Sequence, residues 1–215
     1  MTSALREEIC RVGASLYARG YIHATAGNIS VRTDTGYLIT PTDACLGQLD
    51  PARLAEVDAN GVQTCGDRAS KTLALHQRIY EADPQARCVI HTHSTHLVAL
   101  TLSGVWREQD ILPPITPYFV MKVGHVPLIR YHRPGDPTAG EAVTRAIHAR
   151  RDQGTPIQAV MMDRLGPNVW HRSPAEASAV LEELEETARL WLMTQPEPLT
   201  PAQIEELRQH FGARW

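Results

Sequence analysis

Two histidines separated by one residue are the sharpest chemical feature of the sequence. His91 and His93 follow the short branched run at residues 88–90, and His96 lies close behind. Because side chains two positions apart on a strand point to the same face, both imidazoles can reach one metal ion. A catalytic zinc site usually has three protein ligands and one open position, so a third ligand is needed. On spacing alone, the pair could equally be two polar residues at a strand end.

Three short segments carry groups suited to an anion. Residues 27–30 combine a glycine with the amide of Asn28, and residues 40–43 place Thr42 at the end of a predicted strand. Ser70 and Lys71 stand at the predicted start of a helix, where backbone amides and the helix dipole favour negative charge. Each segment alone is typical of an ordinary turn or cap. Their co-occurrence indicates a phosphate or carboxylate ligand.

Composition limits the classes of protein to consider. The 215 residues are 43% hydrophobic and carry a formal net charge of −3, which describes one folded domain with a core and excludes a disordered chain. No apolar run approaches the roughly 20 residues of a membrane helix, and the acidic start of the chain is unlike a signal peptide, so we expect a cytoplasmic protein. Scattered basic residues argue against nucleic acid as a partner. Without a C-x-x-C pair, the four cysteines are expected to be reduced and mostly packed: Cys10, Cys45, Cys65 and Cys88.

Periodicity predicts the elements that must position these side chains. Helices are predicted at residues 3–20, 70–81, 97–102, 138–151, 173–193 and 200–211. Strands are predicted at 27–32 and 37–40 as a hairpin, at 88–90 and at 157–162, with an extended segment over 119–130, a turn at 166–168 and short strands and turns over 50–61. We therefore expect one α/β domain, residues 1–195, followed by a helical tail, residues 196–215, that has a docking role.

Several motifs together resemble the class II aldolase/adducin family. They are Ala-Gly-Asn-Ile-Ser at 26–30, Ile-Thr-Pro-Thr at 39–42, Leu-His at 75–76 and Val-Ile-His-Thr-His-Ser at 89–94. Segments 112–121, 131–137, 182–188 and 199–211 are most similar to the 3-oxo-tetronate 4-phosphate decarboxylase branch, with fuculose-phosphate aldolase and ribulose-phosphate 4-epimerase as wider relatives. The resemblance covers nearly the whole chain.

The resemblance implies a fold, an assembly and a chemistry. It implies a three-layer αβα sandwich with a central, mainly antiparallel sheet, and a homotetramer with sites at subunit interfaces. It also implies a carbon–carbon lyase, a decarboxylase or aldolase of phosphorylated sugar acids, that uses a divalent metal to stabilise an enolate. Zinc is expected, with manganese or iron as alternatives. The residues matched to these roles are His91 and His93 for the metal, Asn28, Thr42, Ser70 and Lys71 for the substrate phosphate, and Lys71 with Tyr118 for catalysis.

Two positions depart from the family pattern. The family usually has an acidic proton-transfer residue four positions before the histidine that matches His76, and this chain has Thr72 there. The third metal histidine normally precedes a glycine near the end of the domain, and this chain has Leu165 before Gly166. A threonine hydroxyl cannot serve as that base, and leucine cannot bind a metal. The two differences leave three interpretations open.

In the first interpretation, the strand runs far enough to place Asp163 on the same face as residue 165. Asp163 then completes a two-histidine, one-carboxylate site, with His171 as a second candidate. Asp163 could equally be a plain turn residue. In the second, the metal is lost and the chemistry has changed, with Lys71, His91, His93 and Tyr118 as donors and bases. In the third, the chain has a binding or scaffold role without catalysis. His96 is predicted to pack or to orient a neighbour. The histidines predicted to be surface or turn residues are His23, His125, His132, His148 and His210.

Overall fold

The structure is a computed structural model that describes residues 2–215, and its centre is one eight-stranded sheet. The strand order is β4-β3-β2-β1-β5-β8-β7-β6, and every neighbouring pair is antiparallel except β6 and β7. The strands are β1 (Asn28–Arg32), β2 (Gly36–Ile39), β3 (Ala55–Asp58), β4 (Gln63–Cys65), β5 (Cys88–His91), β6 (Leu128–Ile129), β7 (Ala159–Met162) and β8 (Gly166–His171). The predicted hairpin and the mainly antiparallel sheet are confirmed.

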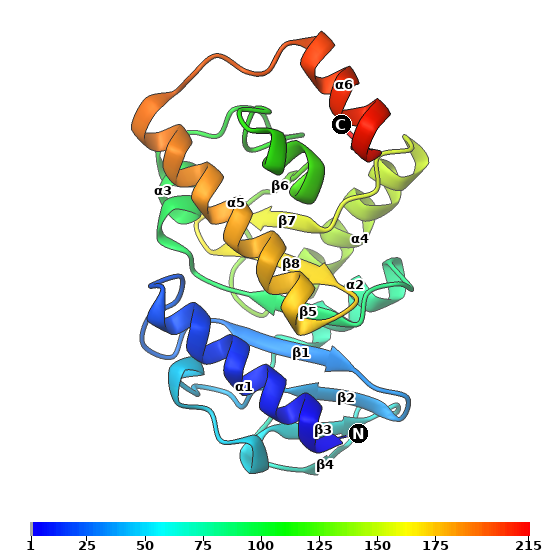
Figure 1. Ribbon diagram of the computed structural model, residues 1–215. Coiled ribbons are helices and arrows are strands. Elements are labelled where there is room, and N and C mark those ends of the chain that lie inside the picture. The colour runs from blue at the N-terminus through cyan, green and yellow to red at the C-terminus, as the bar shows by residue number, and fades with distance from the viewer. Residues whose placement is uncertain (1) are drawn as a thin grey trace.

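Helices cover both faces of the sheet (Figure 1). The helices are α1 (Thr2–Ala18), α2 (Leu73–Ala82), α3 (Thr95–Ser103), α4 (Pro137–Asp152), α5 (Pro174–Thr194) and α6 (Pro201–Phe211), with the short helices η1 (Leu46–Gln48), η2 (Pro51–Arg53) and η3 (Phe119–Val123). One apolar cluster joins α1, α3 and α5 to one face of the sheet, and a second joins α2 and α4 to the other face. The predicted three-layer sandwich is confirmed. Among the described residues, no helix is long and apolar enough to cross a membrane.

Local chemistry explains where the long helices begin. The side chains of Asp136, Ser173 and Thr200 each accept a backbone N–H in the first turn of α4, α5 and α6, respectively. A proline directly follows each of these residues and begins the helix. Such caps satisfy N–H groups that have no partner within the helix. In contrast, α2 begins at Leu73 and not at Ser70 as predicted, because the Ser70 carbonyl and hydroxyl accept N–H groups of a preceding turn.

The prediction of an extended segment over residues 119–130 is wrong for its first half. Residues 119–123 form the π-helix η3, and Leu128–Ile129 is the part that forms a strand. The hydroxyl of Thr116 accepts the N–H of Phe119, and the carbonyl of Phe119 accepts the N–H of Gly124. These two bonds close a wide helical turn around an apolar sequence that resembles a strand.

The predicted turn at residues 166–168 is also wrong. Those residues open strand β8, and the chain reverses before them, at residues 163–165. Arg164 has a φ of 59° and Gly166 a φ of 138°, so the reversal uses two residues with positive φ. A Cβ on Gly166 would lie 1.9 Å from the Thr92 carbonyl oxygen, which explains why glycine stands there.

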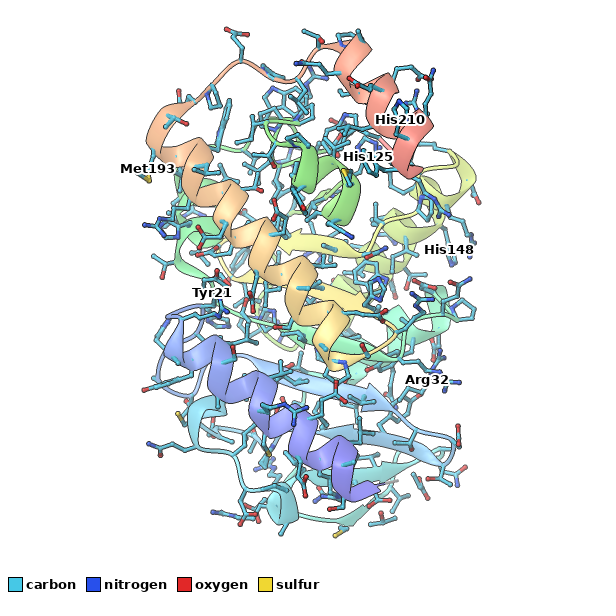
Figure 2. The ribbon with its side chains drawn as sticks, in the orientation of Figure 1. Tyr21, Arg32, His125, His148, Met193 and His210 are labelled. Carbon is cyan, nitrogen blue, oxygen red and sulfur yellow. The ribbon has the colours of Figure 1, made fainter. Side chains whose placement is uncertain are left out.

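The C-terminal segment packs on the rest of the chain. Leu199 donates its N–H to the carbonyl of Pro114, and α6 then contacts η3. The ring of Trp215 stacks on His125 with centroids 4.5 Å apart and lies 5.5 Å from Phe119. Figure 2 shows His125 beside this helix and His210 upon it. A helix is confirmed where the tail was predicted, and the domain boundary at residue 195 stays a prediction.

A buried carboxylate joins α5 to the start of α3. Glu185 is 1% exposed, and its oxygens accept the backbone N–H groups of His96 and Leu97. The Nδ1 atom of His96 lies 2.8 Å from the same carboxylate. Glu185 therefore caps α3, the helix that follows the His91–His93 segment, and His96 orients it instead of facing a ligand.

We expect Glu185→Ala to lower the free energy of unfolding by about 2–4 kcal/mol, because two backbone N–H groups at the start of α3 lose their acceptor. Urea denaturation at one protein concentration measures the change. Glu206→Ala is the matched control, since Glu206 is exposed on α6, and should change stability by less than about 0.5 kcal/mol. Equal stability of the two variants would contradict the capping role.

Candidate active site

The centre of the sheet brings three polar side chains into one row. In the strand register, Asn28 of β1 lies opposite His91 of β5, and His91 lies opposite Asn168 of β8. Neighbouring strands are about 4.8 Å apart, so these side chains are adjacent. Val89, two residues before His91, belongs to the apolar cluster beneath α2 and α4. The row therefore faces that helical layer.

Partnerless polar atoms are concentrated along this row. Among the described residues, six buried side-chain atoms lack a hydrogen-bond partner, and four of them belong to Asn28, His76 and Asn168. His76 projects from α2, and its Nδ1 lies 2.8 Å from the hydroxyl of Ser30, which shares the Asn28 face of β1. Each unsatisfied buried polar group costs about 1–3 kcal/mol. Four in one place indicate a site for a polar ligand.

The rings of His91 and His93 are arranged to act together. Their centroids are 5.0 Å apart, and the ring planes cross at 68°. The Nδ1 atom of His91 lies 2.8 Å from the carbonyl oxygen of Pro167, so it carries the proton and donates it. In the neutral ring, Nε2 of His91 then keeps a free lone pair, as a metal ligand requires.

Burial keeps these imidazoles neutral. The pKa of His76 is lowered to about 3 and that of His91 to about 4. Burial is the main cause in both, and repulsion adds to it: His91 repels His76, and His93 repels His91. The bond to the Pro167 carbonyl raises the pKa of His91 slightly against this trend. The pKa of His93 is lowered by burial and then by His23. The site thus presents uncharged ring nitrogens near neutral pH, the form that binds metals.

The residues predicted to bind phosphate lie around Thr40. Its hydroxyl accepts the N–H of Ile29, next to Asn28, and its carbonyl accepts the N–H of Ser70 at 3.4 Å. Asn28 and Ser70 are therefore brought to one place from distant parts of the sequence. Lys71 is exposed immediately beside Ser70. Thr42 lies two residues beyond Thr40, and its N–H donates to the carbonyl of Arg68.

Two other predicted residues are not joined to the histidines. Strand β7 ends at Met162, so the condition that would place Asp163 on the face of residue 165 is not met. Among residues 2–215, no three His, Cys, Asp or Glu side chains form a group that could hold a metal as they stand. The second candidate, His171, pairs with Cys88 at the other end of β5 and binds Glu176.

Leu165 and Tyr118 lie on opposite sides of the sheet. Leu165 packs against the α2 and α4 cluster, on the side of the sheet that His91 faces. Tyr118 is 62% exposed at the start of η3, and η3 packs in the layer of α5, on the other side of the sheet. Among the described residues, none forms a hydrogen bond with the Tyr118 hydroxyl.

Sequence reasoning misses two residues of the site: it gives His76 no role and places Asn168 in a turn. His23 is exposed in a turn, as predicted, and its ring centroid lies 6.4 Å from that of His93. The usable signal was polar side chains placed in apolar surroundings, as in Asn-x-Ser on β1, but the register that joins them is not visible in one sequence.

Comparison with known proteins identifies the family to which the chain belongs. Residues 7–192 match the family described as class II aldolase and adducin N-terminal domain. The chain belongs to this family. The matched range spans the whole sheet, both helical layers and every candidate residue of the site.

The chain is similar to individual members of the class II aldolase and adducin family. The chain is 55% identical to a 3-oxo-tetronate 4-phosphate decarboxylase of Cupriavidus necator, over 99% of this chain and 98% of that protein. It is 39% identical to the protein of that name in Escherichia coli K12, over 95% of each. A crystal structure of a putative aldolase/epimerase/decarboxylase from E. coli has a TM-score of 0.85 and 39% identity, covering 96% of this chain and 99% of that one. An L-fuculose 1-phosphate aldolase, at 21% identity and TM-score 0.82, supports the fold.

Class II aldolases use a divalent metal ion. The orientation of His91 and His93 and the free lone pair on His91 fit two ligands of one ion: rings that share a tetrahedral ion at Zn–N distances of about 2.1 Å have centres roughly 5 Å apart. Two imidazoles alone leave such a site short of the three protein ligands that are usual for catalytic zinc.

The low pKa of His76 predicts a pH-dependent stability. The unfolded chain protonates His76 near its ordinary pKa of 6.5, whereas the folded chain keeps it neutral down to about pH 3. Between these values the unfolded state binds more protons, so the free energy of unfolding falls as the pH falls, by about 1.4 kcal/mol per pH unit for this residue. We expect His76→Gln to remove that part of the slope in metal-free protein.

Urea denaturation between about pH 6 and pH 4.5 checks this expectation. His210→Gln is the control, because His210 is exposed on α6 and its replacement should leave the slope unchanged. If His76→Gln and the parent chain show equal slopes, His76 does not stay neutral in the folded state.

Proposed function

We propose that this chain is a carbon–carbon lyase that decarboxylates a phosphorylated 3-oxo sugar acid. The observation that carries the proposal is the cluster of partnerless polar atoms of Asn28, His76 and Asn168 beside the paired histidines. Such a cluster, next to residues gathered around Thr40, fits a substrate with a phosphate at one end and a ketone near the other. The alignments with relatives named decarboxylases cover 99% and 95% of the chain, at 55% and 39% identity.

The chemistry of a 3-oxo acid suits a site without a carboxylate base. The ketone stands two carbons from the carboxylate, so the C1–C2 bond breaks with its electron pair passing to C2, C3 and the ketone oxygen. Carbon dioxide leaves, and the enolate that remains takes a proton at C2. Cleavage of an aldol needs a base to remove a hydroxyl proton first. Thr72 in place of an acidic residue therefore favours decarboxylation over aldol cleavage.

The residues of the chain have separate tasks in this proposal. Asn28 and Ser70 bind the phosphate, with Thr42 at the edge of the same site. The ammonium of Lys71, free to move because it is exposed, pairs with the phosphate or the departing carboxylate. His91 and His93 would hold a divalent ion, zinc being the one that imidazoles suit. When bound, such an ion supplies Lewis-acid chemistry at the ketone oxygen.

The exposure of Tyr118 supports a site shared between copies of the chain. Its ring is 62% exposed and lies in the other helical layer from the one that His91 faces. We propose that a homotetramer forms and that Tyr118 approaches the reacting carbon in a neighbouring copy. Light scattering at micromolar concentration tests the assembly, and a monomer would contradict it.

One observation favours a second candidate function. Thr72 and Leu165 replace the two most chemical residues of the family pattern, which suits a member that binds the same class of phosphorylated acid for another reaction or for none. Binding of substrate without release of carbon dioxide would select this candidate.

We expect the purified chain, supplied with zinc, manganese or iron, to release carbon dioxide from 3-oxo-tetronate 4-phosphate. Lys71→Met should lower kcat/KM by about 10–100-fold, because a hydrogen bond to a charged group is lost and is worth about 1.5–3 kcal/mol. A coupled assay of carbon dioxide measures both. No release above the uncatalysed rate with any of the three metals would exclude the decarboxylase.

Lys122→Met is the matched control, because Lys122 is the other lysine of the chain and is also exposed. It lines a cleft with Trp170 and Arg214, at the end of β8 away from Asn168. Its kcat/KM should stay within about twofold of the parent. An equal loss in both variants would mean that net charge, and not contact with Lys71, determines the rate.

A further inference from the structure

A turn that carries His23 brings a third imidazole beside His93. Residues 19–27 connect α1 to β1, and the N–H of Ala26 donates to the carbonyl of His23 to form a tight turn. The His23 side chain is exposed at this turn, and its ring meets that of His93 edge-on, at 73° and 6.4 Å between centroids. Three imidazoles from two distant segments thus follow one another: His91, His93 and His23.

Both ends of this turn are tied to the segment that contains the paired histidines. At one end, the hydroxyl of Ser94 donates to the carbonyl of Tyr21. At the other end, Gly27 lies so close that a Cβ there would be 2.7 Å from the carbonyl oxygen of His91. The position of His23 over His93 therefore follows from contacts on either side of it.

The middle of the turn is held in an unfavourable backbone conformation. Ala24, next to His23, has a φ of 48°, a left-handed value that residues with a Cβ rarely adopt. Such a conformation costs roughly 1 kcal/mol and persists where the surroundings impose it, most often at functional sites. Ala24 directly follows His23 in this turn.

We infer that His23 is the third protein ligand of a metal ion bound by His91 and His93, in place of the histidine that Leu165 displaces. The inference rests on the proposed function, because it completes the ligand set of the same site. A three-histidine set with one open position is a known arrangement for catalytic zinc. As they stand, the three rings do not form a metal site: the His23 and His93 centroids are 6.4 Å apart, against 5.0 Å for His91 and His93. The inference therefore requires the exposed His23 side chain to rotate toward the pair.

The position of Leu165 provides an independent test of geometry. Gly166 lies against the Thr92 carbonyl, so residue 165 also stands beside the His91–His93 segment, on the side of α2 and α4. A histidine introduced there approaches the pair from another direction than His23. If both positions serve one ion, a histidine at either should suffice.

The experiment measures metal binding by the full chain, purified without a polyhistidine tag and stripped with a chelator. Cobalt(II) is titrated while its visible absorption reports coordination, and zinc affinity is measured by competition with a chromophoric chelator. The proteins are the parent, His23→Ala, His91→Ala, His210→Ala, and His23→Ala combined with Leu165→His. His210 is the matched exposed histidine, well apart from Tyr21 and its turn in Figure 2.

We expect one ion per parent chain, and an affinity lowered about a hundredfold or more in His23→Ala and in His91→Ala, since loss of even a supporting partner costs 10–100-fold. His210→Ala should bind as the parent does. The combined variant should recover to within about tenfold of the parent. Circular dichroism should be the same for all five proteins.

Three results would overturn the inference: a parent chain that binds neither ion, parental affinity in His23→Ala, or no recovery in the combined variant. Release of carbon dioxide is measured in parallel, so the two proposals fail separately. Catalysis with parental metal affinity in His23→Ala would reject the His23 ligand and keep the lyase. Metal binding that depends on His23, without catalysis, would keep the ligand and reject the lyase.

Discussion

The pairing of β5 between β1 and β8 is the constraint on which the rest of the site depends. Side chains alternate between the two faces of a strand, so a slip of one residue in either pairing would turn His91 or its neighbours away from α2. The observed register instead aligns Asn28, His91 and Asn168 and places the apolar residues between them in the two cores. The hydrophobic pattern that stabilises the sheet is thus also what selects the polar row.

Burial and neutrality are linked in this row. Burial deep in the sheet favours the uncharged form of an imidazole, because the charged form loses its hydration. An uncharged ring with one nitrogen protonated has a lone pair on the other nitrogen. The carbonyl of Pro167 selects which nitrogen of His91 carries the proton, because proline offers an acceptor and no donor there. The backbone of β8 therefore prepares a side chain of β5 for ligand binding, 76 positions earlier in the sequence.

Local pattern was enough to predict most elements and the His91–His93 pair. The long helices show clear apolar periodicity and strong caps, and β5 is a short branched run that ends in the histidines. Prediction failed at two places. The apolar sequence of η3 is typical of a strand, but the Thr116 hydroxyl accepts the Phe119 N–H and the segment forms a wide helix. Residues 166–168 are types common in turns, but they pair with β5 and β7 as part of a strand. Asn168 could not be found because its place beside His91 comes from the pairing of β8 with β5. Whether Asp163 is a metal ligand or a turn residue could not be predicted, because the answer depends on where β7 ends.

The two outer strands of the sheet limit how copies of this chain can meet. Strand β4 has three residues, offset by an irregular pairing with β3, and β6 has two residues that pair in parallel with β7. Edges this short present few free backbone groups, and natural sheets use such edges to prevent strand-to-strand joining. Copies would therefore associate through side chains of helices and loops and not by continuing the sheet. That mode of contact keeps each sheet separate and resists the open-ended stacking that leads to fibres.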